Sequence, residues 1–290
     1  MADAVPFSDP GLALVVGDHV VCLKWHRMKR RIGDVPFTAS ILAEAFALGA
    51  SSEIDLRVTG DDGFAVLHDA TLDRETTGHG AVAASSDAML RALHMRTPDG
   101  EPTSEPLLLL DDLAALAVRD AADGTLVQLD LKEEAAAITD RVVERFAATL
   151  APVADRFILS GGDLAAVRRL ADAVPGLAAG YDPCDPGVIA PLQTAEDFAR
   201  FTDDAIAASG AMAMIYLAYP LVLKADASGF DMIGAFHAAG KRVDAWTLNT
   251  THPDAAASLA RLVALRADQI TTDEPLRLAA LYAKSDTSQG

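Results

Sequence analysis

Short runs rich in valine, isoleucine and leucine alternate along the chain with longer alanine-rich segments whose apolar residues recur at helical spacing. The short runs predict strands at 19–24, 53–59, 126–132, 157–160, 178–181, 214–217, 243–248 and 268–272. The longer segments predict helices at 38–48, 111–119, 135–150, 163–173, 194–208, 229–239, 253–266 and 275–283. Thr38, Asp163 and Thr194 stand where N-cap residues are expected.

Eight strand–helix alternations in 290 residues favour an α/β fold of the closed (β/α)8 TIM-barrel type. An open, doubly wound sheet is the alternative, but it usually carries a glycine-rich turn after its first strand. Here the first strand runs into Trp25-His26-Arg27-Met28. We therefore expect one barrel domain over residues 1–290.

One connection is longer than a barrel loop needs. About 65 residues separate the second and third predicted strands, whereas such loops usually have about 2–6. Asp61-Asp62-Gly63 is a turn signal, and 64–67 reads as a short strand returning from it. We expect a small insertion at approximately 60–106.

The charge balance restricts the partners. The chain has 24 basic and 42 acidic residues and a net charge of −18, which disfavours binding to nucleic acid and stable association with anionic membranes. An anionic substrate would then need a locally positive site, which a divalent cation beside lysine and arginine supplies. Two cysteines, no apolar stretch of about 20 residues and no basic residue in 1–10 lead us to expect a cytoplasmic protein.

Carboxylates occur at alternate positions of two predicted strands. Glu53 and Asp55 point to the same face, and two buried carboxylates repel unless a cation lies between them. Oxygen ligands favour a hard divalent ion such as Ca²⁺ or Mg²⁺. Asp130 and Lys132 also share a face. Asp130 could be a third metal ligand with Lys132 binding an anion on that metal, or the two could form a simple interior ion pair. A solvated edge strand is the other interpretation of Glu53 and Asp55.

Two histidines follow short strands beside these carboxylates. His26 follows the first strand and His68 the short run in the insertion. Histidine titrates near neutrality, so one can accept a proton while the other donates one. Asp69 either orients His68 or caps the following turn. Trp246 shares a face with Asp244 and either walls a pocket or belongs to the core.

At this point the sequence resembles the glycerophosphodiester phosphodiesterase family. The family's His-Arg-Gly, Glu-x-Asp and His-Asp motifs match, in order, His26-Arg27-Met28, Glu53-Ile54-Asp55 and His68-Asp69. Its Leu-x-Arg-Thr-Thr, Glu-x-Lys, Trp-Thr-x-Asn and Thr-Asp-x-Pro motifs resemble Leu72-Asp73-Arg74-Glu75-Thr76-Thr77, Asp130-Leu131-Lys132, Trp246-Thr247-Leu248-Asn249 and Thr272-Asp273-Glu274-Pro275. The ordered set spans nearly the whole chain.

The resemblance implies a TIM-barrel phosphodiesterase that releases an alcohol and glycerol 3-phosphate from a small glycerophosphodiester. It implies that His26 and His68 form the acid–base pair, and that the divalent cation binds to Glu53, Asp55 and Asp130. Contacts to the substrate would come from Arg27, Lys132 and Trp246.

The sequence departs from the family at several positions. Met28 replaces the glycine, Asp130 replaces a glutamate, and one extra residue separates Arg74 from the two threonines. The family's Pro-Glu-Asn-Thr is not recognisable, and Lys29, Arg30 and Arg31 form a basic loop that could reach a second anionic group. Two alternatives stay open: a phospholipase D-like barrel acting on lipid head groups, and a degenerate barrel that only binds a phosphorylated ligand.

Overall fold

The computed structural model describes residue 9, residues 11–122 and residues 124–286. Within these residues the parallel strands form a closed barrel in the order β2-β12-β11-β10-β9-β8-β7-β3, and β2 pairs with β3 to close it. The barrel strands are β2 (His19–Trp25), β3 (Ser51–Val58), β7 (Leu126–Leu131), β8 (Phe157–Gly161), β9 (Ala178–Tyr181), β10 (Met214–Ala218), β11 (Arg242–Trp246) and β12 (Gln269–Thr272). The expected (β/α)8 TIM barrel is confirmed, and each strand lies within two residues of its expected bounds.

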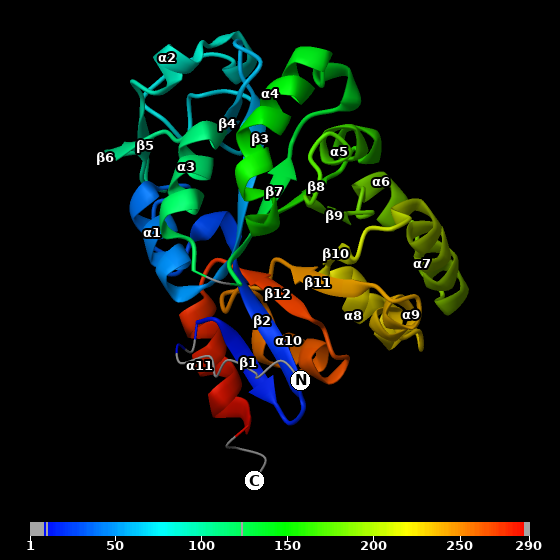
Figure 1. Cartoon of the computed structure of the whole chain (residues 1–290). Coiled ribbons are helices and arrows are strands. Elements are labelled where there is room, and N and C mark those ends of the chain that lie inside the picture. The colour runs from blue at the N-terminus through cyan, green and yellow to red at the C-terminus, as the bar shows by residue number, and fades with distance from the viewer. Residues whose placement is uncertain (1–8, 10, 123, 287–290) are drawn as a thin grey trace.

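Helices surround this barrel (Figure 1). The expected helices correspond to α1 (Ala39–Leu48), α3 (Leu110–Asp120), α4 (Asp140–Leu150), α5 (Leu164–Ala171), α7 (Ala195–Ser209), α9 (Met232–Ala238), α10 (Ala255–Ala264) and α11 (Pro275–Asp286). The side chains of Asp163 and Thr194 cap α5 and α7, as expected. Thr38 is the N-cap residue of α1, as expected, although its side chain makes no cap hydrogen bond.

Other elements differ from the expectation. The predicted helix at 135–150 is split into the 3-10 turn η3 (Ala135–Ala137) and α4, because Thr139 caps α4 separately. The elements β1 (Ala13–Val16), α6 (Pro186–Ile189), α8 (Tyr219–Ala227) and the 3-10 turn η4 (Ala151–Arg156) were not predicted. The strand β1 pairs antiparallel with β2. Among the described residues, no helix is long and apolar enough to cross a membrane.

The segment after β3 holds extra structure, as its length requires. β4 (Phe64–Val66) returns antiparallel along β3, where the short strand was expected. The 3-10 turn η2 (Val82–Ala84), α2 (Asp87–Leu90), β5 (His94–Arg96) and β6 (Pro102–Pro106) follow, and β5 and β6 form a separate two-stranded sheet. In Figure 1 these elements gather beside α1 and α3, on one side of the barrel.

A buried polar network crosses the barrel interior. Lys24 is 2% exposed, its Nζ lies 2.9 Å from Asp244 Oδ2, and it also donates to Gln128. The amide of Gln128 donates to Ser160 Oγ at 2.8 Å, and Ser160 in turn donates to Asp130 Oδ1 at 3.2 Å. Buried polar groups need such hydrogen-bond partners, so this network holds Ser160 in place and, through it, orients the Asp130 carboxylate.

Candidate active site

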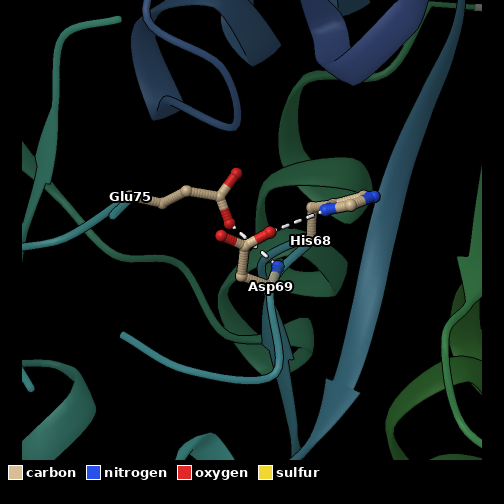
Figure 2. Close-up of side chains that lie close together, drawn as sticks. All are labelled: His68, Asp69 and Glu75. Atoms are coloured by element: carbon tan, nitrogen blue, oxygen red, sulfur yellow. Dashed lines mark hydrogen bonds and ion pairs between the residues drawn. The ribbon is translucent and has the colours of Figure 1, made fainter. Parts of the chain in front are cut away.

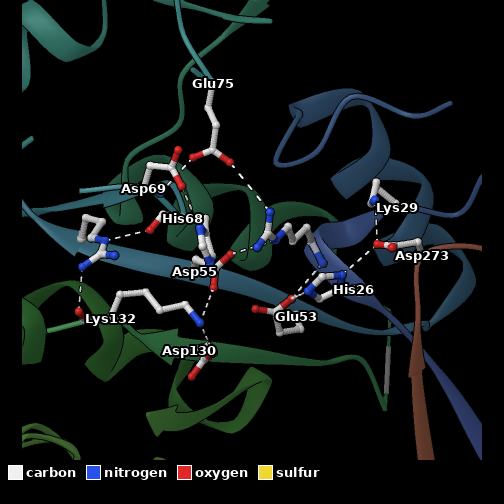
Figure 3. Close-up of polar contacts among 12 residues, drawn as sticks. His26, Lys29, Glu53, Asp55, His68, Asp69, Glu75, Asp130, Lys132 and Asp273 are labelled. Carbon is white, nitrogen blue, oxygen red and sulfur yellow. Dashed lines mark hydrogen bonds and ion pairs between the residues drawn. The ribbon is translucent and has the colours of Figure 1, made fainter. Parts of the chain in front are cut away.

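Three carboxylates meet at one mouth of the barrel (Figure 3). Glu53 and Asp55 come from β3 and are 4% and 1% exposed, while Asp130 comes from β7 directly opposite Asp55 in the parallel register. Oxygen atoms of all three lie within 4.8 Å of one another. The expected inward orientation of Glu53 and Asp55 is therefore found, and the edge-strand interpretation is wrong.

Lys132 lies between two of these carboxylates. Its Nζ is 2.8 Å from Asp55 Oδ1 and 2.5 Å from Asp130 Oδ2. Burial lowers the pKa of Lys132, but the carboxylates of Asp130 and Asp55 outweigh burial and hold that pKa above its usual value. The Asp130–Lys132 ion pair is thus present, in the same cluster as the expected ligands.

The cluster fits a hard divalent cation. Burial, followed by the charges of Asp55 and Asp130, raises the pKa of Glu53 well above its usual value. Asp55 Oδ2 is buried and accepts no hydrogen bond from any described residue. Three converging carboxylates outnumber the two cations beside them, Lys132 and Arg27, and the excess negative charge in this desolvated site is what an oxygen-liganded cation would neutralise.

A left-handed turn brings Arg27 into the site. The 3-10 turn η1 (His26–Met28) has φ of 51° at Arg27, and Met28 also has positive φ, 58°. This turn directs the Arg27 backbone N–H to Glu53 Oε2 at 2.8 Å and the guanidinium Nε to within 3.3 Å of Asp55 Oδ2. Met28 occupies the family's glycine position in a conformation that glycine adopts readily, and its side chain is fully buried in the core.

His26 is oriented by Asp273, the residue that directly follows β12. Its Nδ1 lies 2.7 Å from Asp273 Oδ1, and its Nε2 lies 4.0 Å from Glu53 Oε2. Lys29 Nζ also contacts Asp273, at 2.6 Å, and Asn249 donates to the other Asp273 oxygen at 2.7 Å. Burial raises the pKa of Asp273, but His26 and Lys29 outweigh it and hold that pKa far below its usual value.

His68 has a matching partner (Figure 2). Its Nδ1 lies 2.9 Å from Asp69 Oδ1, and the same carboxylate accepts two bonds of 2.6 Å from Arg74. Those Arg74 bonds hold the pKa of Asp69 below its usual value. Glu75, the extra residue of the motif, accepts the Asp69 backbone N–H at 2.9 Å. Asp69 therefore orients the imidazole, the first of its two expected roles.

A cavity of about 1210 Å³ opens beside this cluster. Asp130, Lys132 and Trp246 line its near end, so Trp246 walls a pocket as expected. The indole Nε1 of Trp246 is buried and has no hydrogen-bond partner among the described residues.

The basic loop does not behave as expected. Only Lys29 turns toward the site, through Asp273. Arg30 pairs with Asp9 and Glu44, and Arg31 pairs with Glu44 at 3.1 Å. Because acidic residues of the described chain already neutralise these two arginines, the expectation that all three cations reach a second anionic group was wrong.

Two residues of the site, Asp273 and Glu75, had no role assigned from sequence, and Lys29 was expected only as part of the basic loop. Asp273 was noted only as part of the Thr-Asp-x-Pro motif, and nothing in the local sequence indicated that it would pair with His26. Glu75 was visible as an insertion between Arg74 and Thr76. It lies 5% exposed, with Oε1 3.2 Å from Arg74 and 3.9 Å from Arg27.

Solved structures with the same fold are numerous. A putative glycerophosphoryl diester phosphodiesterase from Agrobacterium tumefaciens is 22% identical with a TM-score of 0.69, covering 92% of this chain and 99% of its own. One from Silicibacter pomeroyi is 20% identical with a TM-score of 0.69, covering 92% and 95%. An Oleispira antarctica phosphodiesterase in complex with the product sn-glycerol-3-phosphate is 17% identical with a TM-score of 0.65, covering 90% and 96%. At these identities the likeness shows the fold alone.

The sequence itself carries the family assignment. No curated protein matches the chain. The model of the glycerophosphoryl diester phosphodiesterase family matches residues 37–277, which is most of the chain and includes six of the seven expected motifs, from Glu53 to Pro275. The chain therefore belongs to the glycerophosphoryl diester phosphodiesterase family, a family of phosphoric diester hydrolases, as its motifs predicted.

Proposed function

We propose that this protein hydrolyses a glycerophosphodiester to an alcohol and glycerol 3-phosphate, with His26 and His68 as its acid–base pair. The observation that carries the proposal is the pairing of each histidine with an aspartate through Nδ1. A carboxylate at Nδ1 favours the tautomer with the proton on that nitrogen and leaves Nε2 as the reactive atom. Both imidazoles belong to the group of side chains around the carboxylate cluster in Figure 3.

Proton transfer follows from this arrangement. One histidine takes the proton of the nucleophile, which is water or a neighbouring glycerol hydroxyl, through Nε2. As the new P–O bond forms and the bond to the alcohol breaks, the protonated Nε2 of the other histidine gives its proton to the departing alkoxide. If the glycerol hydroxyl attacks, water opens the resulting cyclic diester in a second step with the two roles exchanged. Asp273 and Asp69 stabilise each imidazolium while it carries the extra proton.

Arg27 and Lys132 bind the phosphate oxygens in this proposal. Both cations already lie against Asp55, at 3.3 Å and 2.8 Å, and both are partly exposed to the mouth. Glu53, Asp55 and Asp130 would hold a divalent cation, Ca²⁺ or Mg²⁺, which supplies charge neutralisation at a phosphate oxygen when bound. The structure of the Oleispira antarctica phosphodiesterase with sn-glycerol-3-phosphate supports the choice of product.

Release of glycerol 3-phosphate from glycerophosphoglycerol and glycerophosphocholine tests the function. We expect release when Ca²⁺ or Mg²⁺ is present, loss after dialysis against a chelator, and recovery when the ion is returned. Release of a phosphorylated lipid from lysophosphatidylcholine, without release of glycerol 3-phosphate from either water-soluble diester, would favour the phospholipase D-like alternative. Binding of glycerol 3-phosphate without turnover of any of the three would favour the degenerate barrel.

A further inference from the structure

The cavity beside the carboxylate cluster is strongly acidic. From Lys132 and Trp246 it extends past the carboxyl end of β9 to α6 and α7. Its volume of about 1210 Å³ exceeds what a glycerol moiety fills. Among its charged lining residues, carboxylates outnumber the two cations, Lys132 and Arg200.

Most of these carboxylates already have a structural task. Asp163 and Asp185 cap α5 and α6, and Asp197 accepts the backbone N–H of Thr194 at the start of α7 and pairs with Arg200 at 2.5 Å. Glu133 lies 3.6 Å from the guanidinium of Arg57. These charges are therefore balanced by backbone N–H groups or by arginine, and they do not call for a ligand.

Of the other lining carboxylates, Glu134 and Asp204 are exposed to solvent, whereas Asp182 is half-buried. It follows β9 directly, so it stands at the barrel end where the strands deliver their functional residues. Its Oδ1 accepts the backbone N–H of Cys184 at 2.8 Å, and no lysine, arginine or histidine of the described residues forms an ion pair with it. Burial, followed by the Asp130 carboxylate, raises the pKa of Asp182 to about 7, outweighing the lowering effect of the Cys184 backbone bond.

Two aromatic rings complete the surroundings of Asp182. Tyr181 precedes it in the chain, and both Tyr181 and Trp246 line the same cavity and are half-buried. Ammonium and quaternary ammonium groups bind favourably over aromatic faces, and a carboxylate without a counter-ion adds attraction. A neutral polyol such as glycerol can donate hydrogen bonds to the carboxylate, but it has no positive charge to pair with it.

We propose that Asp182, with the rings of Tyr181 and Trp246, binds a cationic group on the departing alcohol and makes this protein selective for glycerophosphodiesters of amino alcohols. This inference rests on the proposed function, because it assigns the cavity beside the hydrolytic site to the alcohol half of the substrate. Asp182 is then a residue of specificity and takes no part in proton transfer.

The ratio of kcat/KM for glycerophosphocholine to that for glycerophosphoglycerol measures this selectivity, because the two diesters share the glycerol phosphate. We expect wild type to favour glycerophosphocholine by about tenfold or more, and Asp182→Asn to lower the ratio by about tenfold, chiefly through KM. Asp182→Glu keeps the charge and is expected to retain most of the preference. Asp203→Asn removes one exposed carboxylate from α7 outside the cavity and should leave the ratio unchanged.

The outcomes separate this inference from the function on which it rests. Equal turnover of the two diesters by wild type, or a ratio unchanged in a folded Asp182→Asn variant, would overturn the selectivity while leaving the hydrolysis intact. If Asp203→Asn lowered the ratio as much as Asp182→Asn, the net charge of the protein would explain the effect, and the proposed selectivity would also be overturned. If wild type hydrolyses neither diester in the presence of Ca²⁺ or Mg²⁺, the proposed function fails and the selectivity with it.

Discussion

The Nδ1 atom of His26 lies 2.7 Å from Oδ1 of Asp273, although 247 positions separate the two residues in sequence. The barrel makes this contact, because β12 pairs with β2 and brings the connection after each strand to the same mouth. Asn249 and Lys29 hold the Asp273 carboxylate from two other directions. His26 is thus oriented by residues from three separate parts of the chain.

Asp273→Asn should impair turnover by leaving His26 without its carboxylate. The amide can stabilise neither the required tautomer nor the imidazolium, so we expect kcat to fall by about 10²-fold or more with a smaller change in KM.

Lys29→Met provides the control for this variant. It removes the second ion pair of Asp273 and leaves the His26 bond in place. If Lys29→Met lowered kcat as much as Asp273→Asn, the general electrostatics of the carboxylate would explain the loss, and the orientation of His26 would not.

The sequence predicted those parts of the site that follow from local periodicity. Glu53 and Asp55 alternate with apolar neighbours on one strand, so their shared inward face could be predicted. The pairing of His26 with Asp273 is set by barrel closure, which no local pattern reveals. The role of Glu75 was not predicted for a similar reason, because its contact with Asp69 depends on how the segment after His68 folds back.

The carboxylate cluster should make stability depend on the divalent ion. The folded-state pKa of Glu53 is raised, so the folded protein binds more protons than the unfolded chain above pH 4.5 and loses stability as pH rises. We expect Ca²⁺ or Mg²⁺ to raise the Tm of wild type near neutral pH. Glu53→Gln should be more stable than wild type without metal, by about 1–3 kcal/mol, and gain less from the ion. A metal-free Glu53→Gln variant that melts lower than wild type would contradict this.

Asp182 gives a second pH dependence with the same sign. Its pKa is raised to about 7 from 3.8, so the ionised form costs stability, and the cost appears as pH rises from about 4 through about 7. Asp182→Asn should therefore match wild type near pH 4 and exceed it by about 1–3 kcal/mol near pH 8. Urea unfolding at the two pH values measures the difference. A stability gap that stays constant between them would show that Asp182 does not titrate in this range.

Met28 tests whether the left-handed turn or the buried side chain matters more at the family's glycine position. Met28→Gly relieves the strain of a φ of 58° but empties a fully buried site. The cavity effect outweighs the strain, so we expect a net loss of about 2–4 kcal/mol in the free energy of unfolding. Met28→Leu keeps the volume and should lose under about 1.5 kcal/mol. Equal or higher stability of Met28→Gly would mean that strain dominates.

The fold was predictable for similar reasons, and the prediction failed where the sequence pattern was ambiguous. Strand and helix periods identified the barrel, and Asp163 and Thr194 marked helix starts by their capping chemistry. α8 was missed because Tyr219–Ala227 follows β10 without a turn and its apolar residues continue those of the strand. Met28 adopts a positive φ although it is not glycine, so the departure in sequence at this position does not prevent a left-handed turn.

Turnover of glycerophosphoglycerol by His26→Ala, His68→Ala and the double variant tests the central claim most directly. We expect each single variant to lose about 10²–10⁴ in kcat. Groups that act as a unit are not additive, so the double variant should lose little more than the worse single one. Near wild-type kcat in either folded single variant would contradict the assignment of His26 and His68 as the acid–base pair.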